Sequence, residues 1–241
     1  MARKTKQEAL ETRHSILDAA ERLFQQHGVS RTSLQQIAQE AQVTRGAIYW
    51  HFKDKAELFD AMMERATMPL EQGMSIRGAP TQPITLADLR WGLVNVFYCA
   101  THNERTRRVF EIAMQKVEYT GEMQALHERK LSVRRSWRDQ NQAVFDLAVA
   151  QGHLPAGLNT QVAAIALVSL VDGLLHQWIT DPESFDLMGV GQTAVEGFLS
   201  SMARNEGPPL LPPMSPEEWA RLGQQALCQA GASAPNPEQA P

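Results

Sequence analysis

Apolar residues recur every three or four positions along most of this 241-residue chain, which is the spacing of one helix face. The first such stripe consists of Ile16, Leu17, Ala20, Leu23 and Phe24. Gly28 follows this stripe as a helix stop. No stretch alternates β-branched and polar residues for long enough to predict a strand. We therefore predict an all-α fold that begins with a helix over residues 8–27.

Three more helices are predicted within the first 70 residues. Ser33 and Gln36 have the spacing of a capping box and open a short second helix. A third helix begins after Thr44, and a fourth begins after Asp54. Four helices in so short a segment predict a small N-terminal domain.

A larger helical bundle is predicted after a loop. The stretch from Glu71 to Pro83 contains two glycines and two prolines. We therefore predict a loop there and expect domains at residues 1–70 and 71–203. Helices of the second domain are predicted over residues 85–101, 104–119, 122–151, 160–179 and 187–203. Residues 204–241 hold eight of the thirteen prolines, so we expect them to be mostly disordered apart from one candidate short helix over residues 216–230.

Charge is distributed unevenly along the chain. The net charge is −4, yet residues 1–55 carry nine Lys and Arg against six Asp and Glu, which gives this segment +3. A basic end on an acidic body is typical of a local contact with a polyanion. A solvated lysine-rich terminus has the same composition, so charge alone does not decide between these interpretations.

Other function classes find little support in the sequence. No apolar run reaches the roughly 18 residues of a membrane span, and the charged N-terminus lacks the apolar stretch of a signal peptide. We therefore expect a cytoplasmic protein without membrane contact. Cys99 and Cys228 lie far apart and outside any Cys/His cluster, so no metal, cofactor or disulfide is expected. Motifs of the HExxH, DDxxD, P-loop and GxSxG kinds are absent, and we do not expect an enzyme.

The segment from Ser33 to His51 predicts a helix-turn-helix. Its two short helices are joined by a turn around residues 41–43, and in such a motif the second helix enters the DNA major groove. The predicted internal core consists of Leu34, Ile37, Ala38, Val43 and Ile48. The alternative is a helical hairpin inside a core. Three consecutive large rings at residues 49–51 argue against that alternative.

The same segment resembles the DNA-binding motif of TetR-family repressors. The resemblance is carried by TSLQQIAQEAQVTRGAIYWHFKDKAELF, and its VTRGAIYWHFKDK portion is similar to the AcrR and TtgR type, which represses multidrug efflux pumps. Weaker similarity extends it to about residues 1–203. It implies a homodimer that binds pseudo-palindromic double-stranded operator DNA and is released by a hydrophobic or aromatic small molecule. The alternative is a TetR-type repressor of metabolic genes that responds to a lipid or acyl-thioester.

Candidate DNA-binding residues follow from both chemistry and resemblance. Arg45 can donate to a guanine edge or a phosphate, Ala47 leaves room for a thymine methyl, and Gly46 permits close backbone approach. The resemblance implies that Thr44, Arg45, Gly46 and Tyr49 face the DNA groove. It further implies that Ser33, His51 and Lys55 contact the DNA backbone. The predicted set is Ser33, Thr44, Arg45, Gly46, Ala47, Tyr49, His51 and Lys55. Phe52 is predicted to be core, whereas Trp50 is left open between packed and partly exposed.

The later helices resemble the ligand-binding bundle of the family. The predicted pocket residues are Leu89, Leu93, Val96, Phe97, Phe110, Met114, Trp137, Asn141, Val168, Val171, Asp172, Leu175 and His176. Their apolar members would serve a packed core equally well. The polar minority, namely Asp172, His176 and Asn141, favours a cavity for a drug-like ligand. A buried Asp172 satisfied by His176 is the open alternative.

The helices near residues 160–179 and 187–203 resemble the dimer interface of the family. Their small residues are Ala163, Ala164, Ala166, Ser169, Gly173, Ala194, Gly197 and Ser200. Small residues permit close helix approach, but they suit an internal contact as well. The homodimer is therefore expected mainly from the resemblance.

Overall fold

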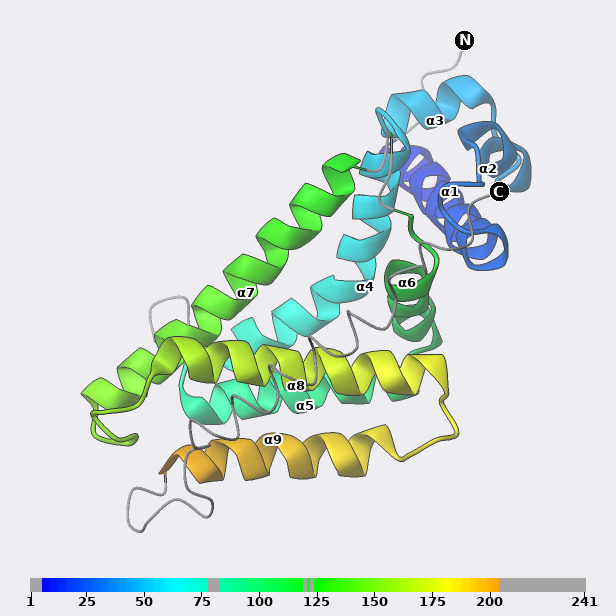
Figure 1. Ribbon diagram of the computed structural model, residues 1–241. Helices are drawn as coiled ribbons and strands as arrows, with labels where there is room; N and C mark the ends of the chain where they lie inside the picture. Colours follow the sequence, from blue (N-terminus) through cyan, green and yellow to red (C-terminus); the bar gives the residue numbers. More distant parts are fainter. Residues whose placement is uncertain (1–5, 78–82, 119–120, 122–123, 204–241) are drawn as a thin grey trace, which may run out of the picture. The chain divides into compact units, whose positions relative to one another are not determined.

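The computed structural model describes residues 6–77, 83–118, 121 and 124–203, and within these ranges it contains nine α-helices and no strand (Figure 1). The all-α prediction is thus confirmed. The described residues between 6 and 203 form one compact unit. The helices are α1 (Lys6–His27), α2 (Leu34–Glu40), α3 (Arg45–His51), α4 (Lys55–Arg77), α5 (Leu86–His102), α6 (Glu104–Gln115), α7 (Gln124–Ala150), α8 (Thr160–Thr180) and α9 (Leu187–Ala203).

Two predicted boundaries are wrong. Helix α4 continues to Arg77, where a loop was predicted from Glu71 onward, because a single glycine costs a helix only about 1 kcal/mol and α4 packs on α5, α6 and α7. Helix α6 ends at Gln115 rather than at residue 119, and the Lys116 carbonyl beyond it accepts a hydrogen bond from the Val29 amide instead. The short helix predicted over residues 216–230 lies outside the described residues.

The buried apolar residues form two clusters. The first joins α1, α2, α3 and the first part of α4, and it also includes Val109 and Ile112 of α6. The second joins α5, α7, α8 and α9, and it includes Phe110 of the same helix α6. Figure 1 shows α1, α2 and α3 gathered at one end, with α4 running from them toward α5. Helix α6 therefore contributes to both clusters, and α4 packs against α5.

Helix α8 is apolar and long enough to cross a membrane by length and composition alone. Its most apolar stretch has a mean hydropathy of 1.7, and 39% of that stretch is buried within the subunit. The core helix of a globular protein has the same properties. Elsewhere on the helix Val162 and Ile165 are exposed apolar residues, at 58% and 45%.

Candidate nucleic-acid interface and its link to the bundle

A tight turn sets α2 and α3 against each other. The capping box predicted at Ser33 and Gln36 is present, so α2 begins where expected. At its other end Gln42 adopts φ 55°, a left-handed conformation that non-glycine residues rarely use, and the Val43 amide donates to the Ala38 carbonyl at 2.9 Å. Thr44 then caps α3 by accepting from the Ala47 amide at 3.2 Å.

Buried side chains beneath α3 fix its orientation. Ile37, Ala38, Ile48 and Phe52 belong to the first apolar cluster and are almost fully buried. The prediction that Phe52 is core is therefore confirmed. Arg13 of α1 stacks over the Phe52 ring, with its guanidinium carbon 5.2 Å from the ring centre. Since Ile48 is the buried residue of α3, the remaining positions of this short helix are left for the surface.

The predicted groove-facing residues lie on that exposed surface. Thr44, Arg45, Gly46 and Tyr49 are exposed, as is Ser33 at the start of α2. Ala47 and His51 are only half-buried. Six of the predicted residues thus lie on α3 or at its N-cap, Ser33 lies at the start of α2, and Lys55 lies at the start of α4.

Arg45 and Tyr49 form a pair in the free protein. The Arg45 guanidinium donates to the Tyr49 hydroxyl at 3.2 Å and lies 5.4 Å from the centre of its ring. The hydrogen bond to Tyr49 raises the pKa of Arg45 above its ordinary value, so the guanidinium remains charged. Two residues one helical turn apart therefore present a cation, a hydroxyl and an aromatic ring on the same face.

Trp50 belongs to this surface as well. It is 72% exposed, more than Tyr49 at 48%, and its ring contacts His51 edge to face. Gly46 and Trp50 are one turn apart and lie beside the Arg45–Tyr49 pair. The run of three large rings after Ile48 indicated an exposed aromatic surface in the sequence. It did not determine whether Trp50 is packed or exposed.

Lys55 differs from its prediction. Its side chain is buried, and its ammonium donates to the Thr32 carbonyl at 3.0 Å and to the Ser30 carbonyl at 3.2 Å. The sequence placed it at a helix start, where a lysine can reach a phosphate, but the loop before α2 folds over it. The place of Lys55 in the structure therefore does not support the predicted phosphate contact.

A charged cluster joins α1, α4 and α6. Arg65 of α4 pairs with Asp18 at 2.8 Å and with the buried Glu21, and Arg105 of α6 pairs with Asp18 at 3.0 Å and with Glu21 at 3.5 Å. The Glu21 side chain is only 2% exposed, so its carboxylate depends on these two guanidinium groups. This cluster holds the helix-turn-helix against the two helices that continue into the bundle.

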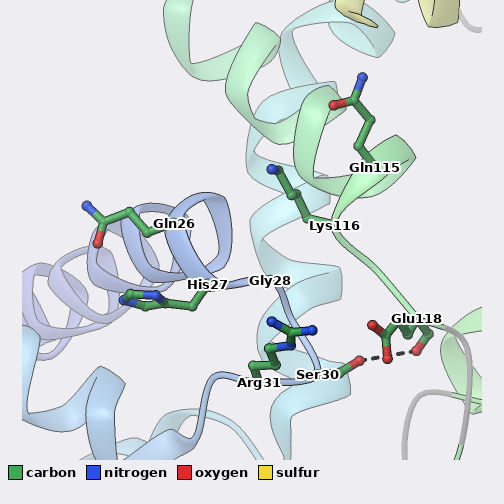
Figure 2. Close-up of a pocket in the computed structure, with 8 residues that line it drawn as sticks. All are labelled: Gln26, His27, Gly28, Ser30, Arg31, Gln115, Lys116 and Glu118. Carbon is green, nitrogen blue, oxygen red and sulfur yellow. Dashed lines mark hydrogen bonds between the residues drawn. The ribbon is translucent and has the colours of Figure 1, made fainter.

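The loop between α1 and α2 also contacts α6. The Val29 amide donates to the Lys116 carbonyl at 2.9 Å, and the Ser30 hydroxyl donates to the Glu118 carbonyl at 3.4 Å. Figure 2 shows the cavity at this contact, which has a volume of about 300 Å³. It is lined by Gln26, His27, Gly28, Ser30, Arg31, Gln115, Lys116 and Glu118. All these lining residues come from the ends of α1 and α6 and the segments that follow them.

The predicted ligand-binding residues lie mostly in the packed interior of the bundle. Within the second apolar cluster the buried members are Leu89, Leu93, Phe97, Phe110, Val171 and Leu175, and the half-buried ones packed against it are Val96, Met114 and Trp137. Val168 is half-buried. A second cavity, of about 420 Å³, lies between α5 and α9 and is lined by Leu86, Arg90 and Leu199 among others. None of the predicted pocket residues lines either cavity.

The predicted polar pocket groups behave differently from one another. Asp172 of α8 forms an ion pair with Arg134 of α7, and His176 is exposed. The alternative of a buried Asp172 satisfied by His176 is therefore wrong. Asn141 of α7 is 3% exposed, and its side-chain nitrogen Nδ2 has no hydrogen-bond partner among the described residues. It is the one predicted pocket residue with a buried polar atom that lacks a partner.

The small residues of α8 and α9 divide between two faces. Ala163 and Ala164 are buried within the subunit, so they serve an internal contact. At Gly173 and Gly197 a side chain would meet nothing within 4 Å. Ser169 and Ser200 are exposed, whereas Ala166 and Ala194 are half-buried. Exposed or open positions thus occur on both helices, namely Val162, Ile165, Ser169 and Gly173 on α8 and Gly197 on α9.

Comparison with known proteins identifies two matched regions. Residues 16–62 match the family described as bacterial regulatory proteins of the tetR family. Residues 84–204 match the C-terminal region of MAATS-type transcriptional repressors. The first region runs from the middle of α1 to the first part of α4, and the second covers the helices from α5 to α9.

Individual relatives agree with this assignment. The chain is 42% identical over 192 residues to the HTH-type transcriptional regulator AcrR of Shigella flexneri, and the aligned region covers 78% of this chain and 87% of that protein. It is 39% identical over 189 residues to the regulator TtgR of Pseudomonas putida, covering 78% and 90%.

Solved structures show the same fold. NalD, the secondary repressor of the MexAB-OprM multidrug efflux pump of Pseudomonas aeruginosa, matches with a TM-score of 0.73 and 33% identity over 83% of this chain and all of that one. SmeT in complex with triclosan matches with a TM-score of 0.72 and 33% identity over 86% and 99%. SmeT is the repressor of the SmeDEF multidrug efflux pump of Stenotrophomonas maltophilia. This chain therefore belongs to the TetR family of bacterial transcriptional regulators.

Proposed function

We propose that this protein represses a multidrug efflux pump operon and is released from its operator by an aromatic or otherwise hydrophobic small molecule. The exposed face of α3, with Arg45, Tyr49 and Trp50 on a rigidly packed helix-turn-helix, is the observation that carries the DNA-binding half. NalD and SmeT, each described as an efflux pump repressor, support the choice of operon. Such a repressor acts in the cytoplasm, where its operator DNA is located.

Operator recognition is assigned to α3 and the starts of its neighbouring helices. Arg45 can donate two hydrogen bonds to a guanine edge, and Tyr49 can contact a base or a phosphate from the adjacent turn. Ser33 and Thr44 stand at helix N-termini, where the positive end of the helix dipole attracts phosphate. Phosphate contacts set the register of α3 in the groove, while base contacts set the sequence preference.

The active species is proposed to be a homodimer through α8 and α9. These helices carry the exposed Val162, Ile165 and Val190, which a second copy would bury. Gly173 and Gly197 leave room for close approach of a partner helix. A two-fold dimer presents two recognition helices, and it therefore requires a pseudo-palindromic operator.

The effector is proposed to enter between α5, α7 and α8, where the predicted pocket residues line an apolar interior. Asn141 shares its helix face with Trp137 and Phe145, which are one turn away on either side. A ligand oxygen that accepts from Asn141 Nδ2 would satisfy the buried amide. Triclosan, the compound in the SmeT complex, offers aromatic rings and oxygen acceptors of this kind. An unpartnered amide fits such a ligand better than the acyl chain of a lipid.

The proposed repressor function is tested by binding the purified full chain to DNA from its own upstream intergenic region, with random DNA of equal length as competitor. We expect specific binding and a footprint with two-fold symmetry. Tyr49→Ala should abolish specific binding while circular dichroism shows an unchanged fold, because Tyr49 is exposed in the free protein. Equal affinity for the upstream and the random DNA would contradict the proposal.

A further inference from the structure

The buried side chain of Lys55 connects two parts of the DNA-binding region. Its ammonium donates to Ser30 and Thr32 through their backbone carbonyls, and the residue is only 6% exposed. A buried ammonium is tolerated only where such acceptors replace water. Lys55 therefore anchors the loop at residues 28–32 to the first turn of α4.

The same loop is held from its other side by the end of α6. The Val29 amide and the Ser30 hydroxyl donate to the backbone carbonyls of Lys116 and Glu118, and Figure 2 shows the Ser30 contact beside the cavity. Gly28 opens the loop with φ +83°, and a Cβ there would lie 3.4 Å from the Lys116 carbonyl oxygen. The loop thus lies between α4 and α6 and contacts both.

The position of this loop determines where α2 begins. Thr32 is followed directly by Ser33, the N-cap of α2, and α2 carries α3 through the tight turn at Gln42. Helix α6 contributes residues to both apolar clusters, so a movement in the bundle reaches the loop through its contact with Val29. The loop between Lys55 and α6 therefore constrains the start of α2, in addition to the buried side chains that support α3.

We propose that Lys55 is a positioning residue for operator binding, acting by holding the loop at residues 28–32 against α6, and that it is not a phosphate ligand. This inference rests on the proposed operator-binding function. Removing the ammonium frees the loop from α4, so α2 and α3 lose part of their fixed orientation before DNA arrives. The number of phosphate contacts stays the same.

Salt dependence separates positioning from phosphate contact. In Lys55→Met we expect operator affinity to fall by about 5-fold or more. The slope of log K against log salt concentration should stay as in the wild type. The loss of a phosphate contact would reduce that slope by about 0.9. Lys53→Met, at an exposed lysine two residues earlier, makes the same charge change and is the matched control. A slope reduced by about 0.9 in Lys55→Met and not in Lys53→Met would overturn the proposal.

Amide hydrogen exchange supplies a readout that works without DNA. We expect exchange at the Val29 amide to accelerate by about tenfold in Lys55→Met, while the Phe52 amide, which donates to the Ile48 carbonyl at 2.8 Å, keeps its wild-type rate. Equal acceleration at both amides would mean that Lys55 affects only global stability, and no change at Val29 would mean that it does not hold the loop. Either result contradicts the proposal.

Gly28→Ala tests the loop with Lys55 intact. An alanine at φ +83° is strained, so we expect weaker operator binding with an unchanged salt slope and faster Val29 exchange. Wild-type affinity in Gly28→Ala with faster Val29 exchange would show that loop position does not matter for DNA. If the wild type binds no operator at all, the proposed function fails, while the exchange data still report whether Lys55 holds the loop.

Discussion

Both the DNA-binding end and the bundle are built from packed helices, but their candidate functional residues lie in different places. In α1 to α4 the buried residues form a rigid support, and function is assigned to side chains that project from it, such as Arg45 and Tyr49. In the bundle the residues assigned to function, such as Phe97 and Leu93, are themselves buried in the core. The candidate DNA-binding surface can therefore be recognised in the free protein, whereas the predicted pocket residues line neither of the two cavities described above.

The largest effect is expected where the rigid support carries a buried charge. Arg65→Met leaves the Glu21 carboxylate with Arg105 alone, so we expect a loss of about 3 kcal/mol in the free energy of unfolding. Urea denaturation measures this loss. The control is Arg22→Met, which breaks the exposed pair with Glu40 and should cost less than about 1 kcal/mol. Similar losses in the two variants would show that the buried cluster does not stabilise the junction.

The second prediction concerns the outer face of the bundle. Gly197→Arg places a long charged side chain at an open position of α9, and we expect it to convert a dimer into a monomer and to remove tight operator binding. Gly157→Arg, in the loop before α8, where a side chain also meets nothing within 4 Å, is the matched control outside the two helices. Light scattering after size exclusion measures both. A dimer that persists in Gly197→Arg would rule out this interface.

The third prediction concerns the exposed surface of α3. Arg45→Ala should weaken operator binding by about 1–3 kcal/mol if its guanidinium contacts a guanine edge, and thermal stability should not change because the side chain is exposed. Arg135→Ala removes an exposed arginine from α7 and controls for net charge. Gel shift titrations compare the two variants. An unchanged affinity in Arg45→Ala would remove this residue from the recognition surface.

The smallest effect tests whether the bundle holds a ligand site. Asn141→Leu removes a buried amide nitrogen without a partner, so we expect the ligand-free protein to become more stable by about 1 kcal/mol. The same change should weaken triclosan binding, because the hydrogen-bond donor is lost. Calorimetry measures both quantities. A less stable protein with unchanged triclosan affinity would show that Asn141 only packs the core.

The two regions also differ in what their sequence predicts. Capping boxes and apolar stripes predict most helix boundaries, and Ile48 with its exposed neighbours predicts the surface of α3. The end of α6 was missed because the Lys116 carbonyl just beyond it accepts from a distant backbone amide, that of Val29, which no local pattern reveals. The burial of Lys55 was not predictable either, since only the folded loop reveals that its ammonium donates to two backbone carbonyls.

In the bundle, neither the sequence nor the structure distinguishes the wall of a ligand pocket from a core face. Periodicity identifies Leu89, Leu93 and Phe97 as one face of a helix, but a core face and a pocket wall have the same pattern. The partner of Asp172 was unpredictable because Arg134 lies 38 residues away on another helix. Polar residues within an apolar face narrow the search, and Asn141 is the one whose burial without a partner supports a ligand site.

We predict that a ligand bound in the bundle changes the affinity of the protein for its operator. The most direct measurement is the operator affinity of the full chain with and without saturating triclosan, by fluorescence anisotropy at fixed salt. We predict that triclosan weakens operator binding by about 5-fold to 150-fold, the range of typical coupling free energies. An operator affinity that stays the same while calorimetry shows triclosan bound to the protein would contradict this account.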